Sequence, residues 1–171
     1  MARREKEIKR GFIPSKRRRG NVSVPERLSV LDRAERHAVL ATDSNGQPYT
    51  SLITYALLPG LKGVVFATPR ITFKYKNILE NRRVALLIDN RSNREEGLMK
   101  AEAITIVGTA RPIRRGKKWE ELAKILIRKH PNLSKFVRSP STVLVLIEAI
   151  RCFHVSRFQT VSQWDVSSSI N

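Results

Sequence analysis

The feature that most constrains the fold is an Asn45-Gly46 pair between two segments rich in apolar and β-branched residues. Asn-Gly favours the tight turn of a β-hairpin, so residues 37–42 and 47–57 are predicted to pair as antiparallel strands. Further strands are predicted at residues 63–67, 84–89 and 101–110, and residues 142–150 and 152–158 are predicted to form one more antiparallel pair. Tight connections rather than long crossovers join the first three strands. The sequence therefore predicts a mainly β fold, an antiparallel sheet closed or nearly closed as a barrel, with helices filling the gaps.

Helices are predicted in three places along the chain. The first begins at Ser23, a candidate N-cap with Glu26 three residues later, and is expected to end near Arg36. The second spans residues 72–80, where apolar residues recur at positions 71, 75, 78 and 79. The third contains Trp119 and is broken at Pro131, with a shorter helical piece at 133–137.

Composition divides the chain into a basic arm, a domain and a tail. Residues 1–22 lack hydrophobic periodicity, residues 23–159 hold the predicted helices and strands, and residues 160–171 are polar but include Trp164. The formal net charge is +18, and residues 1–20 alone carry nine Lys and Arg against two Glu. Such a charge attracts nucleic acid and other anions. The arm therefore either binds such a partner, or is solvated, or packs on a partner subunit.

Several classes of protein are excluded by composition and motifs. No apolar run approaches the roughly 18 to 20 residues that span a bilayer, so no membrane partner is expected. A single cysteine, Cys152, rules out an internal disulfide and favours a cytoplasmic location. The sequence contains no Gly-x-Ser-x-Gly, no P-loop, no Gly-x-Gly-x-x-Gly and no zinc-ligand spacing. It therefore predicts no metal site and assigns no catalytic residue.

The best candidate binding site lies in residues 66–77, Phe-Ala-Thr-Pro-Arg-Ile-Thr-Phe-Lys-Tyr-Lys-Asn. A predicted strand runs into Thr68, a turn containing Arg70 follows, and a helix begins at Thr72 with Lys74 and Lys76 in its first turns. Amides at a helix start are unpaired and the helix dipole favours an anion there, so these residues predict a phosphate site. Taken singly, Thr72 is equally well explained as a helix cap, and the two lysines as solvated surface residues.

In order and spacing, residues 39–52, 64–68 and 72–86 resemble the pyridoxamine-5′-phosphate-oxidase-like flavoproteins, which bind FMN on a split β-barrel. The resemblance covers residues 31–110 and, more loosely, 142–164. It implies FMN at the interface of a homodimer, with the phosphate held by Thr72 and Lys74. The other cofactor-binding positions that it implies are Ser51, Leu52, Ile53 and Thr54 beside the ring, Thr68 at the end of the next strand, Lys76 at a position that is often basic, and Arg70. Pyridoxal-making members have an Arg beside the matching Lys, where this chain has Phe73, which removes one phosphate ligand.

The C-terminal region matches the family less well. Trp164 either covers the flavin, which makes it a cofactor-binding candidate, or packs as an anchor. Pyridoxal-making enzymes carry an Arg-x-His pair near their C-terminus, but His154 lies three residues after Arg151, so a structural role is expected for it.

The resemblance implies an FMN-dependent oxidoreductase that acts on an unidentified small substrate. Pyridoxal phosphate synthesis is not assigned, because the C-terminal substrate motif is not evident. Relatives of this fold also bind the deazaflavin F420 or haem, which leaves the identity of the cofactor open. A flavin-binding protein that stores or senses FMN without turnover fits the same residues. The alternative outside the family is a non-enzymatic protein that binds nucleic acid or another anion through its basic arm and surface.

Overall fold

A computed structural model describes residues 23–92, 97, 100–156 and 160–166, so the predicted basic arm at 1–22 lies outside the described residues. In chain order the elements are α2 (Val24–Ala34), β1 (His37–Ser44), β2 (Gln47–Leu57), the 3₁₀ turn η1 (Pro59–Leu61), β3 (Gly63–Pro69), α3 (Phe73–Glu80), β4 (Arg83–Asp89), β5 (Glu102–Ile113), α4 (Lys117–Lys129), the 3₁₀ turn η3 (Pro131–Leu133), α5 (Ser134–Arg138), β6 (Thr142–Ser156) and β7 (Thr160–Asp165).

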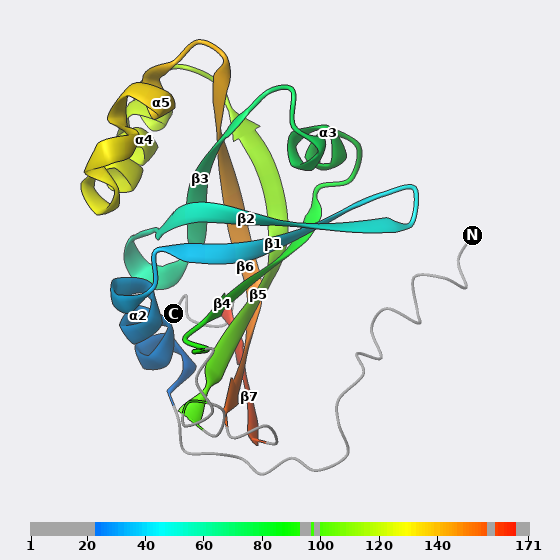
Figure 1. The fold of residues 1–171 in the computed structure, drawn as a ribbon, viewed down its shortest axis with the longest axis vertical. Helices are drawn as coiled ribbons and strands as arrows, with labels where there is room; N and C mark the ends of the chain where they lie inside the picture. The colour runs from blue at the N-terminus through cyan, green and yellow to red at the C-terminus, as the bar shows by residue number, and fades with distance from the viewer. Residues whose placement is uncertain (1–22, 93–96, 98–99, 157–159, 167–171) are drawn as a thin grey trace.

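The strands form one antiparallel sheet that closes into a six-stranded barrel (Figure 1). The strand order is β3-β2-β1-β4-β5-β6, β6 pairs back onto β3, and β7 extends the sheet from the second half of β6. Asn45 and Gly46 have φ values of 52° and 83°, as a two-residue hairpin turn requires. The predicted fold class, a mainly β antiparallel barrel with helices, is confirmed.

The barrel is split between β2 and β3. β1 and β2 pair over eight residues, whereas β2 and β3 pair only at Tyr55–Leu57 with Val64–Phe66. Along residues 47–54, the edge of β2 that faces away from β1 carries no other strand of the described chain. α3 lies beside this opening, above the projecting tip of the β1–β2 hairpin in Figure 1.

β6 differs most from the prediction. The two paired strands predicted at 142–150 and 152–158 are wrong, because residues 142–156 form one continuous strand. The first half of β6 pairs with β3, and the second half pairs with β7, so part of the predicted polar tail belongs to the sheet. A local irregularity does occur at the predicted break, since the β5–β6 register shifts beside Gly108 and leaves Ile150 as an extra residue.

The ends of two helices also differ from the prediction in detail. Ser23 caps α2 as predicted, with its Oγ accepting a hydrogen bond from the Glu26 amide at 3.4 Å. α2 ends at Ala34 rather than near Arg36, because the next residue takes up extended backbone with φ −98° and ψ 130°. α3 begins at Phe73, with Thr72 in the cap position. None of the helices in the described chain is long and apolar enough to cross a membrane.

Two groups of apolar side chains stabilise the barrel. Alternate residues of each strand point inward, and α2 packs against this interior group, which includes Leu40, Tyr55, Phe66, Leu86 and Ile106. A second group lies on the outside of β3 and β6, where α4 and α5 cover Val65, Leu144 and Leu146. β3 and the first half of β6, residues 142–147, are therefore buried on both faces and read as mainly apolar runs.

A charge cluster holds α2 against the barrel. Arg27 of α2 makes a two-point ion pair with Glu102 of β5, with Nε 3.0 Å from Oε2, and His154 Nε2 lies 2.9 Å from the same carboxylate oxygen. Burial opposes ionisation of Glu102, but the hydrogen bonds from Arg27 and His154 outweigh it and hold the pKa of this carboxyl below its usual value. The cluster therefore contributes to stability while Glu102 is ionised.

We expect Gly108→Ala to lower the free energy of unfolding by about 1–3 kcal/mol. A Cβ at this position would lie 2.3 Å from Glu148 O of β6, so the paired strands would have to move. Urea denaturation measures the loss. Val107→Ala, at the exposed neighbouring position, is the matched control and should change stability by only about 0.5 kcal/mol. Equal losses in the two variants would contradict the close approach of β5 and β6.

Glu102→Gln is expected to cost about 1–3 kcal/mol at neutral pH, because it leaves Arg27 and the buried His154 facing a neutral amide. The folded pKa of Glu102 lies below its unfolded value, so its contribution is present at neutral pH and is lost as the pH falls below about 4.5. Denaturation at neutral and acidic pH measures both effects. Glu148→Gln, which breaks an exposed ion pair with Arg111, should cost about 0.5 kcal/mol, and an equal loss there would rule out a special role for Glu102.

Candidate functional site

Three segments meet at the split in the barrel: the open edge of β2, the end of β3 and the start of α3. Three side-chain hydrogen bonds of the described chain hold α3 against the β1–β2 hairpin. Asn77 Nδ2 donates to Thr42 Oγ1 at 3.1 Å, Asn81 Nδ2 donates to Asp43 Oδ1 at 3.1 Å, and Ser44 Oγ donates to Glu80 Oε2 at 2.5 Å. The hydrogen bond between Asn77 and Thr42 is buried, so it satisfies two polar groups that water does not reach. The middle and the end of α3 are thereby fixed against β1, the strand paired with β2.

Thr68 and Thr72 are in contact at this place. The two Oγ1 atoms lie 3.0 Å apart, and Thr72 Oγ1 donates to Pro69 O at 3.0 Å, which leaves Thr68 as the donor between the threonines. Thr72 occupies the N-cap position of α3 but makes no side-chain capping hydrogen bond. The hydroxyl of Thr72 therefore does not cap α3 in the described chain, and the first-turn amides of α3 are left without that acceptor.

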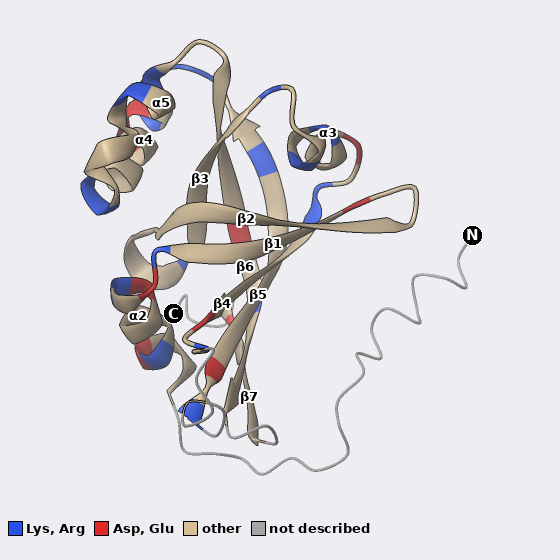
Figure 2. Ribbon diagram, in the orientation of Figure 1, with Lys and Arg blue, Asp and Glu red and all other residues tan. Residues whose placement is uncertain are grey.

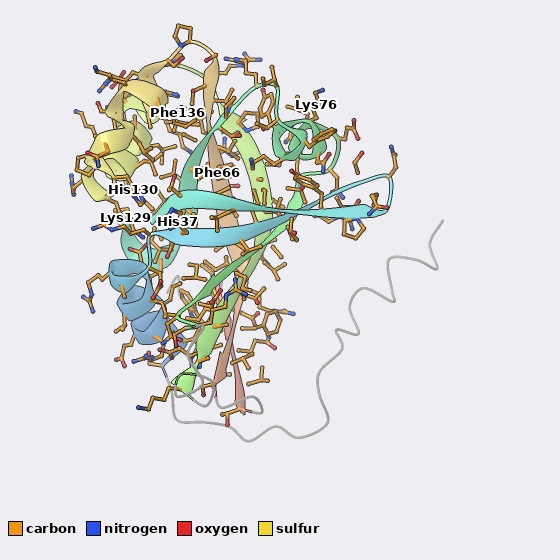
Figure 3. The ribbon with its side chains drawn as sticks, viewed as in Figure 1. His37, Phe66, Lys76, Lys129, His130 and Phe136 are labelled. Carbon is orange, nitrogen blue, oxygen red and sulfur yellow. The ribbon has the colours of Figure 1, made fainter. Side chains whose placement is uncertain are left out.

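Lys74 and Lys76 differ in their surroundings. Lys74 is half-buried, and burial lowers the pKa of its amine with no offsetting carboxylate among the described residues. Lys76 is exposed on α3 (Figure 3), with Nζ 5.9 Å from the centroid of the Phe73 ring. A partly desolvated cation gains more from an anion than a solvated one does, so Lys74 is the stronger phosphate candidate.

The four candidates on β2 face opposite sides of the strand. Ile53 is 6% exposed and packs in the barrel core, and Ser51 on the same face has a buried Oγ that no described residue is placed to satisfy. Leu52 points outward and is 67% exposed, and Thr54 shares that face. The side chains of Leu52 and Thr54 are therefore available to a ligand, whereas the side chain of Ile53 lies in the barrel core.

An apolar contact flanks these residues. The ring centroids of Tyr49 on β2 and Phe73 on α3 lie 6.0 Å apart. The side chain of Phe73 is 68% exposed, and Ile71 and Leu79 are also exposed. In the sequence, Phe73 is notable only because it replaces an Arg that would bind phosphate. In the structure, its ring contacts Tyr49 and so links the start of α3 to β2. Tyr49 is missed altogether, because strand periodicity does not say which face meets a helix.

Two predicted site residues lie elsewhere. Arg70 is exposed and lines a separate hollow with Tyr75 and the end of β5. Trp164 of β7 pairs across from Cys152 of β6 and packs against the core. The strand β7 lies at the end of the barrel remote from α3 (Figure 1). The structure thus brings together the candidates on β2, β3 and α3, but does not bring Arg70 or Trp164 to them within one chain.

The three histidines also lie away from the helix start. His37 is exposed at the beginning of β1, close to His130 at the end of α4 (Figure 3). His130 Nε2 lies 2.8 Å from Tyr55 O, and burial lowers the pKa of this imidazole. His154 is bound to Glu102, as expected of a structural histidine. Within the described ranges, no group of three or more His, Cys, Asp or Glu side chains is placed to hold a metal ion.

A larger hollow, of about 530 Å³, lies between α2, the β2–η1 connection and α4. Its Lys129 has Nζ 2.5 Å from Asp32 Oδ1 and 3.9 Å from the centroid of the Tyr55 ring, and burial lowers the pKa of this amine. None of the site residues predicted from the sequence lines it. The sequence gives no signal for this hollow, because its three walls are distant in the chain and carry no motif.

Comparison with known proteins agrees with this architecture. The sequence profile of the family described as pyridoxamine 5′-phosphate oxidase matches residues 25–155, from α2 to β6. No curated protein matches the chain.

Solved structures share the fold at low sequence identity. A haem-binding protein from Mycobacterium smegmatis superposes with a TM-score of 0.75 at 16% identity, and the match covers 87% of this chain but only 60% of that one. A FAD-binding protein from Mesorhizobium loti gives 0.64 at 17% identity, covering 78% and 92% of the two chains. A protein of the pyridoxinephosphate oxidase family from Clostridium acetobutylicum gives 0.66 at 14% identity, covering 84% and 94%.

Ser51→Ala is expected to stabilise the ligand-free protein by about 0.5–1 kcal/mol, because it removes a buried hydroxyl that has no partner in the described chain. Thr42→Val is the contrasting variant. It removes a hydroxyl that donates to Tyr49 O and accepts from Asn77, and should destabilise by about 1–3 kcal/mol. Thermal or urea denaturation measures both changes. A loss in Ser51→Ala as large as that in Thr42→Val would show that the Ser51 hydroxyl is paired.

Proposed function

The chain belongs to the pyridoxamine 5′-phosphate oxidase family, and on that premise we propose that it is an FMN-binding flavoprotein that acts as an oxidoreductase on a small substrate. The phosphate end of FMN lies at the start of α3, and the ring lies along the outer face and open edge of β2. The residues that hold the phosphate are Thr68, Thr72 and Lys74.

One observation carries this proposal. The half-buried Lys74 lies at the start of α3 beside the hydroxyls of Thr68 and Thr72, which are hydrogen-bonded to each other, and no described side chain caps this helix start. The phosphate of FMN is close to a dianion and needs cations together with hydroxyl or amide donors. Lys74, the two threonines and the first amides of α3 are such a set. The backbone groups on the open edge of β2 supply the hydrogen bonds that the heteroatoms of the ring require.

When bound, the flavin supplies two-electron transfer with the substrate, which no side chain of the protein can provide. The chain's own residues bind and orient the cofactor. Leu52 and Thr54 form the surface beneath the ring, and the Tyr49–Phe73 contact keeps water from the side of the phosphate end. No residue of the site is assigned to proton transfer.

A homodimer is part of the proposal. Leu52, Phe73 and Ile71 are large apolar side chains that stay exposed around the same strand edge and helix start. Exposed apolar surface of this kind marks a binding interface in a soluble protein. A second copy that packs here covers these side chains and encloses the flavin from the side that one chain leaves open.

Haem is the second candidate cofactor, because a haem-binding protein is among the structural neighbours. Its carboxylates suit the same cations, but its iron needs an axial ligand. His130 and His154 are both buried and hydrogen-bonded, and the exposed His37 lies at the start of β1, away from α3. The hydroxyls and amides at the helix start favour a phosphate, and thus a flavin, over haem.

Lys74→Ala is expected to weaken FMN binding about tenfold or more, since it removes a charge-assisted contact with the phosphate. Riboflavin lacks the phosphate, so its weaker binding should be unchanged by the same substitution. Burial lowers the pKa of Lys74, so the FMN affinity of the unaltered protein should fall at alkaline pH before exposed lysines lose their charge. Titration followed by the quenching of flavin fluorescence measures all three effects.

The matched control is Lys124→Ala, which removes an exposed lysine of α4 and should leave FMN affinity unchanged. Equal weakening in this control, or equal weakening of riboflavin, would overturn the phosphate assignment. A purified protein that stays colourless after incubation with FMN would sink the flavin proposal itself. A Soret band in the purified protein would assign haem, and salt-sensitive nucleic-acid binding without any chromophore would assign the non-enzymatic alternative.

A further inference from the structure

A smaller hollow, of about 230 Å³, lies on the opposite side of α3 from the flavin site. Tyr75 lines it, whereas Phe73 faces Tyr49. Successive residues of a helix are turned by about 100°, so the side chains of Phe73 and Tyr75 point about 200° apart. We refer to this space as the arginine hollow, and the residues of its lining that matter here are Arg70, Tyr75, Arg114, Arg115, Trp119 and Thr142.

The charge of the arginine hollow is not balanced by any acidic residue of the described chain. Arg70 comes from the β3–α3 connection and Arg114 and Arg115 from the β5–α4 connection, two segments that are blue at the same end of the barrel in Figure 2. No acidic residue lines the hollow, and none of the three arginines pairs with a carboxylate of the described chain. By contrast, the nearby Arg111 and Arg138 pair with Glu148 and Glu120.

One of these arginines is held in place. The Arg115 guanidinium stacks on the Trp119 ring at 3.8 Å from its centroid and donates hydrogen bonds to the backbone oxygens of Arg138 and Ser139, at 3.2 and 3.0 Å. The Arg70 amide donates to Ser141 O at 3.1 Å, which fixes the loop that carries Arg70 against the start of β6. The backbone of Arg70 and the side chain of Arg115 are thus held in place before a ligand binds, which lowers the conformational entropy that binding would lose.

A buried polar group marks the same place. Thr142 is 2% exposed and lines the arginine hollow, and its Oγ1 has no hydrogen-bond partner among the described residues. Buried hydroxyls are normally paired, so this one indicates a group that the chain itself does not supply. The volume is below the roughly 300–1,000 Å³ of sites for drug-sized ligands, which is too small for a whole flavin.

We infer that the arginine hollow binds the phosphate group of a small organic monoester, at a site separate from that of the flavin. Guanidinium groups match the oxygens of a phosphate in a two-point geometry, and three of them favour a dianion over a carboxylate. The aromatic rings of Tyr75 and Trp119 line the space that the organic part occupies. The site does not depend on the proposed flavin function, and its test does not require a bound flavin.

Calorimetric titration of the full-length protein with phenyl phosphate, at constant ionic strength, tests the inference. We expect saturable binding, and about tenfold weaker binding in Arg70→Gln and in Arg114→Gln. Inorganic phosphate should bind more weakly than phenyl phosphate if the rings contact the organic part, and benzoate should bind much more weakly than either. Lys74→Ala and an excess of FMN should leave the phenyl phosphate affinity within about twofold, which is below the effect of a lost charge-assisted contact.

Lys118→Gln is the matched control, because it removes one exposed charge of α4 that does not line the hollow. An equal loss in Lys118→Gln would show attraction by the general charge of the protein and would overturn the inference. The absence of saturable binding, or binding of benzoate as tight as that of phenyl phosphate, would also overturn it. Competition by FMN, but not by riboflavin, would place the flavin phosphate in the hollow instead.

Discussion

The pairing of β3 with β6 closes the barrel, and the position of the site follows from it. Seven residue pairs join these two strands, against three between β2 and β3. Gly63 permits the approach, since a Cβ there would lie 2.2 Å from Ile147 O. Because β3 runs along β6 for its whole length, β2 keeps a strand partner on only one side along residues 47–54, and the hairpin that contains it projects from the barrel.

α3 lies beside the opening that this geometry leaves. The buried hydrogen bond from Asn77 to Thr42 and the contact of Phe73 with Tyr49 hold the helix at the unpaired edge of β2. A fully closed barrel would satisfy that edge with another strand, and a capped helix would satisfy its own first amides. Here both sets of donors lie side by side, and they suit a ligand with an anionic end and a ring that accepts hydrogen bonds.

Much of this arrangement could be predicted from local sequence. Asn45-Gly46 determines the hairpin through positive φ values, and Ser23 caps α2, because each effect involves residues that are close along the chain. β6 could not be predicted as one strand, because the strand stays continuous across the extra residue Ile150 only through its pairing with β3, β5 and β7. The same limit applies to the site: Thr68, Thr72 and Lys74 are recognised as a local pattern, whereas Tyr49 and the arginine hollow depend on contacts between distant segments.

The direction in which α3 presents each residue determines which site a charge serves. Family members that make pyridoxal have an Arg where this chain has Phe73, and that position faces Tyr49 and the edge of β2. Three arginines of this chain, Arg70, Arg114 and Arg115, lie instead around Tyr75, on the other side of the helix. Arg70 precedes α3 by only a short turn. Its amide nevertheless donates a hydrogen bond to Ser141 O, which places Arg70 beside the start of β6 rather than beside Lys74. A count of basic residues near the helix start therefore overstates the charge at the proposed phosphate site, and the proposal assigns a correspondingly larger part to the hydroxyls of Thr68 and Thr72.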